Sequence, residues 1–191
     1  TFVFFDTSGA FDTFSNPPDT NTSGTQQDTN PSNTCVYHYD PPMPDLCTAD
    51  QICILDNGLG GPGHCEGAFG RLYAVNLGGV RIPERRSDGG CWDLGCGAPD
   101  IFFEVLLDGR TILTTTTIDD RFEADAINEH GSALISSGSV LQIMLYDEDI
   151  TENELMSGCQ LNPVSADSLR TRIFACGSGT EPSFLFSLSL Q

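Results

Sequence analysis

PDIFFEVLLDGRTILTTTTI, residues 99–118, is the stretch from which the fold of this protein can be inferred. It contains two β-rich runs, IFFEVLL and TILTTTTI, that flank the dipeptide Asp108-Gly109. An Asp-Gly pair between runs of branched and aromatic residues is a strong signal for a short β-hairpin turn. The stretch therefore predicts two antiparallel strands that follow one another closely along the chain.

Further segments of the same kind occur after Ala68. The expected strands are RLYAVNLGGVRI (71–82), SVLQIMLY (139–146), SLRTRIF (168–174) and SFLFSLSL (183–190). In SVLQIMLY the side chains of Leu141, Ile143 and Leu145 alternate with their neighbours, which predicts that one face of this strand points into a core. No segment longer than about ten residues keeps a helical period. Short strands separated by turn signals predict an all-β fold, an antiparallel β-sandwich.

The composition divides the chain into three parts. Residues 1–34 form an apolar strand followed by a polar tether, residues 35–67 a small disulfide-rich module, and residues 68–191 the sandwich. The eight cysteines contain no CxxC pair and the histidines are scattered, so disulfides in an oxidising, extracellular compartment are expected. These cysteines are Cys35, Cys47, Cys53, Cys65, Cys91, Cys96, Cys159 and Cys176. The first four allow three pairings, and the sequence does not choose among them.

The charge of the chain restricts its partners. Twenty-seven acids face eight basic residues, all of them arginine, and the net charge is −19. A chain with so few cations is a poor ligand for nucleic acid, whose backbone is bound by clusters of Lys and Arg. The sequence also lacks the GxSxG and HExxH motifs, and its residues suggest no catalytic constellation. We therefore expect a non-enzymatic protein for which divalent cations are the natural counterpart.

Carboxylates gather in two loops of the expected sandwich. The first loop, SDGGCWDLGCGAPD (87–100), contains Asp88, Asp93 and Asp100 and directly precedes the hairpin. The second, YDEDITENELMSG (146–158), begins with Asp147 and Asp149 where the strand ends. Calcium takes six to eight oxygen ligands from flexible loops, so such an arrangement suits it. A solvated acidic turn without a metal is the alternative.

The segments PDIFFEVLLDGRTILTTTTI and LQIMLYDEDITENELMSG resemble the calcium-binding C2 domain, over roughly residues 68–191. The resemblance implies a C2-like sandwich with a structural Ca²⁺ ion. It implies that the ligands are Asp93, Asp100, Asp147, Asp149 and Glu154, with Asp88 as a possible substitute for Asp93. The sequence departs from the family pattern at Ile101, where proline is usual, and at the last acid, which is Glu and stands one residue early.

Cysteines flank both acidic loops of the C2-like region. One arrangement pairs Cys91 with Cys96 and Cys159 with Cys176, and cross-pairing between the loops is the other. Trp92 is expected to pack over its own disulfide; alternatively, Trp92, Leu94 and Ile150 would enter lipid, as apolar loop tips of C2 domains do. The absence of lysine and the negative charge disfavour an anionic membrane as the partner.

The opening segment, TFVFFDTSGAFDTF (1–14), is an apolar strand that requires a sheet to pack against. Its assembly residues are Phe2, Val3, Phe4, Phe5 and Phe11. The strand either completes its own sandwich or is donated to a neighbouring subunit. Donation predicts a homo-polymer, hence a secreted structural subunit of an extracellular fibre or surface assembly. The alternative is a monomeric Ca²⁺-dependent module that binds lipid or glycan.

Overall fold

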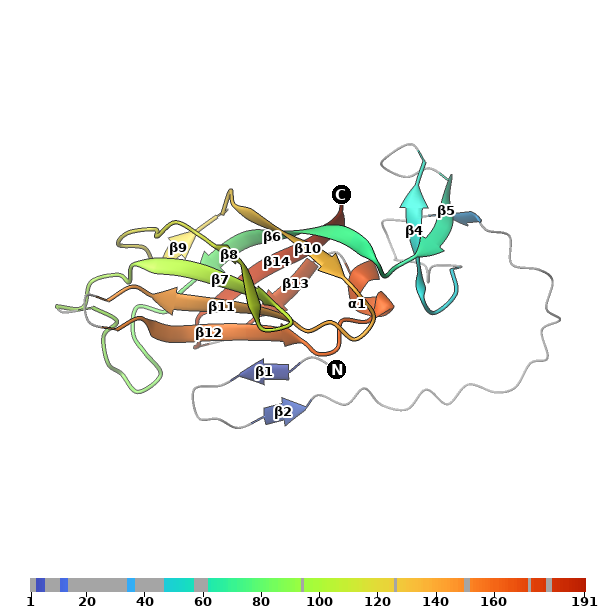
Figure 1. Cartoon of the computed structure of the whole chain (residues 1–191). Coiled ribbons are helices and arrows are strands. Elements are labelled where there is room, and N and C mark those ends of the chain that lie inside the picture. The colour runs from blue at the N-terminus through green and yellow to red at the C-terminus, as the bar shows by residue number, and fades with distance from the viewer. Residues whose placement is uncertain are drawn as a thin grey trace.

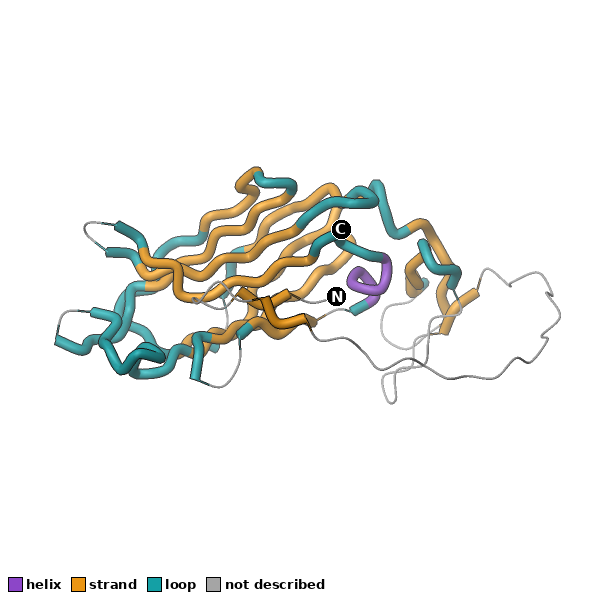
Figure 2. The backbone as a smooth tube through the Cα atoms, turned by 90° about the horizontal axis from the view of Figure 1, so that it is seen from below, coloured by secondary structure: helices purple, strands orange, loops and turns teal. Residues whose placement is uncertain are grey.

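The architecture is described from a computed structural model of the chain (Figure 1). It describes residues 3–5, 11–13, 34–36, 47–56, 62–93, 95–125, 127–149, 152–171, 173–177 and 180–191. Most of these residues belong to two large antiparallel sheets that face each other, and a small third sheet lies at one end (Figures 1 and 2). The predicted all-β sandwich, with a disulfide-rich segment before it, is confirmed.

The first large sheet has six strands in the order β2-β1-β12-β11-β7-β8. Its strands are β1 (Val3–Phe5), β2 (Phe11–Thr13), β7 (Ile101–Leu107), β8 (Arg110–Thr114), β11 (Leu141–Asp147) and β12 (Glu154–Leu161). The hairpin predicted at Asp108-Gly109 joins β7 to β8, and both residues have positive φ, 51° and 75°. Positive φ at both central residues is the signature of a type I′ turn, whose twist matches that of the two flanking strands. Asp-Gly is favoured in this turn because both residues tolerate positive φ.

The second large sheet has the order β10-β6-β14-β13, and β9 pairs with β6. Its strands are β6 (Arg71–Arg81), β9 (Glu123–Ala124), β10 (His130–Ile135), β13 (Ile173–Cys176) and β14 (Ser183–Leu190). Alternate residues of these strands are buried, as strand geometry requires. In β14, for example, Phe184, Phe186 and Leu188 point inward while Leu185 is exposed.

The core lies between the two large sheets. Phe103 of β7 and Phe184 of β14 meet edge to face across it, with ring centroids 5.1 Å apart. The disulfide between Cys159 of β12 and Cys176 of β13 joins the same two sheets covalently. This pairing, together with Cys91–Cys96, is one of the two arrangements that the sequence left open.

One expected strand is wrong at its start. Residues 168–170, placed in a strand from the sequence, belong instead to the helix α1 (Ala166–Arg170). Ser165 caps this helix: its hydroxyl accepts from the Ser168 amide, and the Ser168 hydroxyl pairs back to the Ser165 amide. This capping box stabilises a helical turn that the strand-like composition did not suggest. Among the described residues, no helix is long and apolar enough to cross a membrane.

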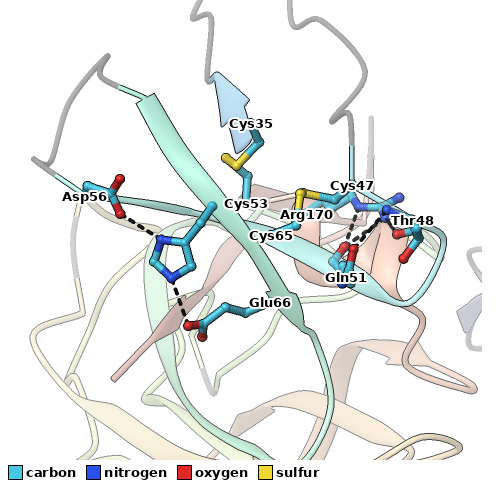
Figure 3. Close-up of a disulfide and its surroundings, with 10 residues drawn as sticks. Cys35, Cys47, Thr48, Gln51, Cys53, Asp56, Cys65, Glu66 and Arg170 are labelled. Atoms are coloured by element: carbon cyan, nitrogen blue, oxygen red, sulfur yellow. Dashed lines mark hydrogen bonds and ion pairs between the residues drawn. A yellow bond between two sulfur atoms is a disulfide. The ribbon is translucent and has the colours of Figure 1, made fainter. Parts of the chain in front are cut away.

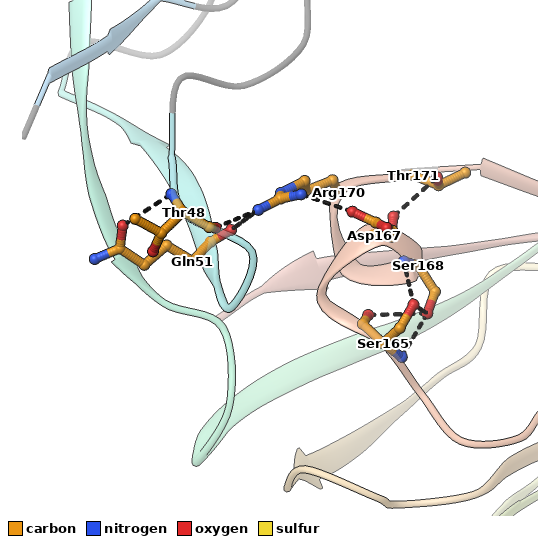
Figure 4. Close-up of polar contacts among 7 residues, drawn as sticks. All are labelled: Thr48, Gln51, Ser165, Asp167, Ser168, Arg170 and Thr171. Atoms are coloured by element: carbon orange, nitrogen blue, oxygen red, sulfur yellow. Dashed lines mark hydrogen bonds and ion pairs between the residues drawn. The ribbon is translucent and has the colours of Figure 1, made fainter. Parts of the chain in front are cut away.

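The small third sheet, β3-β5-β4, consists of β3 (Thr34–Val36), β5 (Pro62–Gly67) and β4 (Gln51–Leu55). Two disulfides, Cys35–Cys53 and Cys47–Cys65, staple it (Figure 3). It is docked on the sandwich, because Ile52 belongs to the main core. The Arg170 guanidinium at the end of α1 also donates to the backbone carbonyls of Thr48 and Gln51, at 2.6 and 2.8 Å (Figure 4).

The opening strand lies on its own chain. The backbone of β1 pairs antiparallel with the edge of β12, with Val3 opposite Gln160 and Phe4 opposite Cys159. β2 then pairs with β1, so that the two short strands complete the six-stranded sheet at its β12 edge (Figure 1). Of the two placements that the sequence allowed, the structure shows the one in which the strand completes the sandwich of its own chain. Phe2 lies outside the described residues.

Candidate metal centre at the loop end of the sandwich

The acidic loops meet at the end of the sandwich that lies opposite the small third sheet (Figures 1 and 2). Strand register explains the meeting. Asp147, the last residue of β11, lies opposite Ile101 at the start of β7 and opposite Glu154 at the start of β12. Because these strands are antiparallel neighbours, the loops that precede β7 and follow β11 leave the sheet at the same edge.

Asp147 is the centre of this group. The residue is 0% exposed, so its carboxylate is removed from solvent. Oδ1 accepts a hydrogen bond of 3.0 Å from the Asp100 amide, whereas the buried Oδ2 has no hydrogen-bond partner in the described part of the chain. A buried carboxylate oxygen without a donor is costly unless a cation or water satisfies it. Asp147 is thus the acid of this group for which a bound cation would remove the largest desolvation cost.

Asp100 connects three loops through hydrogen bonds. Its carbonyl accepts from the Glu148 amide at 2.7 Å, and its Oδ1 accepts from the Asp120 amide at 2.7 Å. The Glu148 carboxylate in turn accepts a short hydrogen bond from the Thr117 hydroxyl. These contacts hold the connection after β8 against the two predicted loops. The structure therefore adds Asp120 to the group of acids.

The carboxylates of this group repel one another, and burial together with this repulsion raises the pKa of two of them. Burial, followed by the charges of Asp93, Asp149 and Glu154, raises the pKa of Asp147 to about 6, although the hydrogen bond from the Asp100 amide opposes the rise. Burial also raises the pKa of Asp93, with additional contributions from Asp100, Asp149 and Asp120. Such mutual repulsion is expected where carboxylates share a site, and a bound cation relieves it.

The first loop is held by contacts around Trp92. The indole residue is 8% exposed, and its Nε1 donates to the Pro83 carbonyl at 2.7 Å. The Cys91–Cys96 disulfide closes the loop on either side of it. Trp92 is therefore a packed residue at the base of the loop rather than an exposed loop tip. Leu94 and Ile150, the other expected loop tips, lie outside the described residues.

Asp88 has a local role in the same loop. Its Oδ1 accepts a hydrogen bond of 2.8 Å from the Gly90 amide, which forms a tight side-chain turn on the exposed surface. Asp93, by contrast, is coupled to Asp100, Asp120 and Asp149. Asp93 is accordingly the better candidate for a ligand from this loop.

Glu154 is engaged by an arginine. The Arg86 Nη2 lies 2.5 Å from the Glu154 Oε2, and the two side chains are 29% and 38% exposed. Glu154 remains close enough to Asp147 to raise its pKa. It therefore stands at the site, but with its carboxylate already paired.

Sequence reasoning missed both Asp120 and Arg86 as members of this site. Asp120 lies in the stretch after the predicted hairpin, where no motif distinguishes it from the neighbouring Asp119. Its position depends on the bridge between Ile101 and Ile118, which forms only when the hairpin folds back on itself. Arg86 precedes the predicted loop ligands by several residues, and no motif marks it.

The donor set matches the chemistry of calcium. All candidate ligands are carboxylate oxygens, which a hard cation prefers, and one of these oxygens is buried without a partner. Among the described residues, however, no three of these acids have oxygens that all lie within 4.8 Å of one another. The side chains would have to move inward around an ion. The candidate ligands are Asp93, Asp100, Asp120, Asp147, Asp149 and Glu154.

Two other features do not form a comparable site. Cys35, Cys47 and Cys65 bring their sulfurs together, but all three are consumed by disulfides. An open cavity of about 430 Å³ lies on the second large sheet, and its lining includes the ion pair of Arg81 and Glu123 but none of the predicted acids.

A third feature is a polar cluster in the small sheet. The His64 ring bridges Asp56 at 2.7 Å and Glu66 at 2.8 Å (Figure 3), and Glu66 also pairs with Arg71. The hydrogen bond to Glu66, followed by that to Asp56, raises the pKa of His64. This cluster links the strands of the small sheet to β6 and has no catalytic partner among the described residues.

Comparison with known proteins bears on the fold. No family model and no curated protein matches the sequence. Among solved structures, the part of Extended-Synaptotagmin 2 that contains its SMP domain and two C2 domains matches with a TM-score of 0.50 and 14% identity, covering 63% of this chain and 27% of that one. The pair of C2 domains from the same protein, calcium bound, matches with a TM-score of 0.49 and 15% identity, covering 63% and 45%. A structure of a C2 domain matches with a TM-score of 0.46 and 16% identity, covering 62% and 98%. At these identities the likeness concerns the backbone alone: the sandwich of this chain has the C2 fold.

Proposed function

We propose that this chain is a non-enzymatic, extracellular C2-like module that binds Ca²⁺ at its loop end and, through the ion, an anionic group of a lipid or glycan. The observation that carries the proposal is the buried Oδ2 of Asp147, which has no hydrogen-bond partner among the described residues and lies among acids from three loops. Asp93 and Asp149 add charge to the same point. Four disulfides support the extracellular setting, because such bonds persist in oxidising compartments.

The ion would neutralise the facing carboxylates and leave some coordination positions for oxygens of a ligand. The chain's own residues prepare the site. Asp147 supplies a desolvated oxygen, and the Asp100 amide orients that carboxylate through its hydrogen bond of 3.0 Å. The Cys91–Cys96 disulfide restricts the loop that bears Asp93, which lowers the entropy lost when the loop orders around a cation.

Calcium titration followed by isothermal calorimetry and thermal unfolding tests the cation site. At about one hundred times the dissociation constant, a ligand specific for the folded state stabilises by about 2.7 kcal/mol. For a chain of this size that corresponds to a rise of roughly 5–10 °C in melting temperature. Asp147→Asn should remove both the heat of binding and the rise. A wild-type protein with neither response would contradict the proposal.

The anionic ligand is tested separately. Vesicles of phosphatidylcholine, with and without phosphatidylserine, are sedimented with the protein in Ca²⁺ or in EGTA. Pelleting that requires Ca²⁺ and fails in Asp147→Asn identifies lipid phosphate as the ligand. If calcium binds but no vesicle pellets the protein, immobilised acidic glycans are tested in the same two buffers, and retention only in Ca²⁺ identifies the glycan.

Head-to-tail assembly by strand donation has less support. In the structure β1 pairs with β12 of its own chain. β1 therefore already occupies the sheet edge to which a donated strand would have to bind. Analytical ultracentrifugation of the full chain and of a chain lacking residues 1–14 separates the two possibilities. Self-completion predicts that the full chain sediments as a monomer. Polymers that form from the full chain and vanish on truncation would instead establish donation.

A further inference from the structure

Arg86 lies at the border between the first loop and β12. Its Nη2 contacts the Glu154 carboxylate at 2.5 Å and donates to the Trp92 carbonyl at 3.0 Å. Its guanidinium carbon also lies 5.2 Å from the centroid of the Trp92 ring, within the range of a cation–π interaction. One side chain thus connects the packed base of the loop to an acid of the candidate metal centre.

The loop fixes Arg86 in this position. The Arg86 amide donates to the Gly90 carbonyl at 3.0 Å, and the Gly89 amide donates to the Arg86 carbonyl at 2.9 Å. The Trp92 ring against which the guanidinium lies is itself held by its bond to the Pro83 carbonyl. Both the turn around Arg86 and the Trp92 ring are held by hydrogen bonds. The Arg86 guanidinium therefore points at Glu154 instead of extending into solvent.

The Arg86 guanidinium is positively charged, whereas every candidate ligand is a carboxylate. A single guanidinium near several carboxylates partly offsets their repulsion, as a bound cation does. It lowers the pKa of Asp93, against burial and the neighbouring acids, which raise it. The Arg86 Nε is buried and has no hydrogen-bond partner among the described residues. The guanidinium is therefore not held by a complete set of hydrogen bonds.

We propose that Arg86 is a built-in counter-cation, which pairs with the Glu154 carboxylate at the edge of the metal centre and is displaced from it when Ca²⁺ binds. This inference rests on the proposed calcium site and concerns its affinity. The ion pair stabilises the acids without a metal and competes with coordination by Glu154. Arg86 consequently weakens calcium binding and sets the concentration at which the site fills.

The experiment compares calcium affinity in matched variants by isothermal calorimetry. Arg86→Met keeps apolar length against Trp92 and removes the charge, and we expect affinity to rise by about tenfold. Arg85→Met is the control, because Arg85 is an exposed neighbour of the same charge that contacts Gly89 and Cys91 instead of an acid. It should change affinity less than about threefold. Arg86→Lys retains the charge and should stay close to wild type.

A double-mutant cycle with Glu154→Gln separates competition from a general effect of charge. If Arg86 acts through Glu154, the gain from Arg86→Met largely disappears when residue 154 is already Gln. Without Ca²⁺, Arg86→Met should also lower the melting temperature, which shows the pair as a stabilising contact. Wild-type calcium binding with no gain in Arg86→Met, or an equal gain in both backgrounds, overturns the inference alone. No calcium binding in any variant overturns the proposed function and the inference with it.

Discussion

The backbone amide of Asp100 donates a hydrogen bond of 3.0 Å to the Oδ1 of Asp147, across 47 residues of sequence. Together with the pairing of Asp147 and Ile101 in the sheet, this contact aligns the entry to β7 with the exit from β11. It also leaves the other carboxylate oxygen of Asp147 without a donor among the described residues. The bond thus orients the acid that is most deeply buried in the candidate site.

Replacing Asp147 with Asn should stabilise the protein in EDTA. The change removes a desolvated charge and keeps an oxygen for the Asp100 amide, and the new amide group can donate to the neighbouring carboxylates. We expect a gain of roughly 1–2 kcal/mol in the free energy of unfolding, measured by urea denaturation. Asp88→Asn, on the exposed turn of the first loop, is the control and should be close to neutral. A loss of stability in Asp147→Asn would show that the charge is already compensated.

The pH dependence follows from the raised pKa of Asp147. Its value of about 6 lies above the ordinary 3.8, so between these values the folded state binds more protons than the unfolded state. Stability without a cation should therefore increase as the pH falls from about 6 toward 4. Calcium affinity should change in the opposite direction, because the ion requires the ionised carboxylate. Urea denaturation in EDTA and calorimetry with Ca²⁺, both at pH 5 and 7, measure the two slopes. In Asp147→Asn, the contribution of this residue to the first slope should vanish.

The Cys159–Cys176 disulfide should contribute strongly to stability because it joins the two large sheets. It closes a loop with a sequence separation of 17, for which the chain-entropy model predicts a loss of about 3 kcal/mol when both cysteines become alanine. The pair Cys91 and Cys96, separated by 5, provides the comparison within one loop. Its removal should cost less in urea denaturation, by about 1 kcal/mol in the same model. Equal losses would show that linking the sheets confers no special advantage.

Arg170 should determine how firmly the small sheet is docked. Arg170→Met removes the charged donors to the carbonyls of Thr48 and Gln51 and should lower the free energy of unfolding by about 1–3 kcal/mol. Hydrogen exchange of β4 amides should become faster, while that of β11 stays as in wild type. Arg110→Met, at the exposed start of β8, is the matched control. Unchanged exchange in β4 would mean that other contacts, such as the packing of Ile52 in the main core, hold the sheet in place.

How far the sequence predicts this molecule depends on whether the information is local. The hairpin at Asp108-Gly109 is predictable, because an Asp-Gly turn adopts positive φ values that few other residues accept. The inward alternation of Leu141, Ile143 and Leu145 is equally local, and all three are fully buried. The helix at Ala166–Arg170 shows the limit, since a capping box overrode the strand-like composition around it.

The same distinction between local and long-range information applies to the candidate site. The sequence by itself determined the fold class and the two loops that carry Asp93, Asp100, Asp147 and Asp149, because strand periodicity and runs of acids are local features of the chain. Only the tertiary structure decided that Asp120 joins those acids, that Arg86 pairs with Glu154, and that β1 lies on its own β12. These are contacts between segments distant in sequence, and their geometry depends on strand register and on which loops leave the sheet at the same edge.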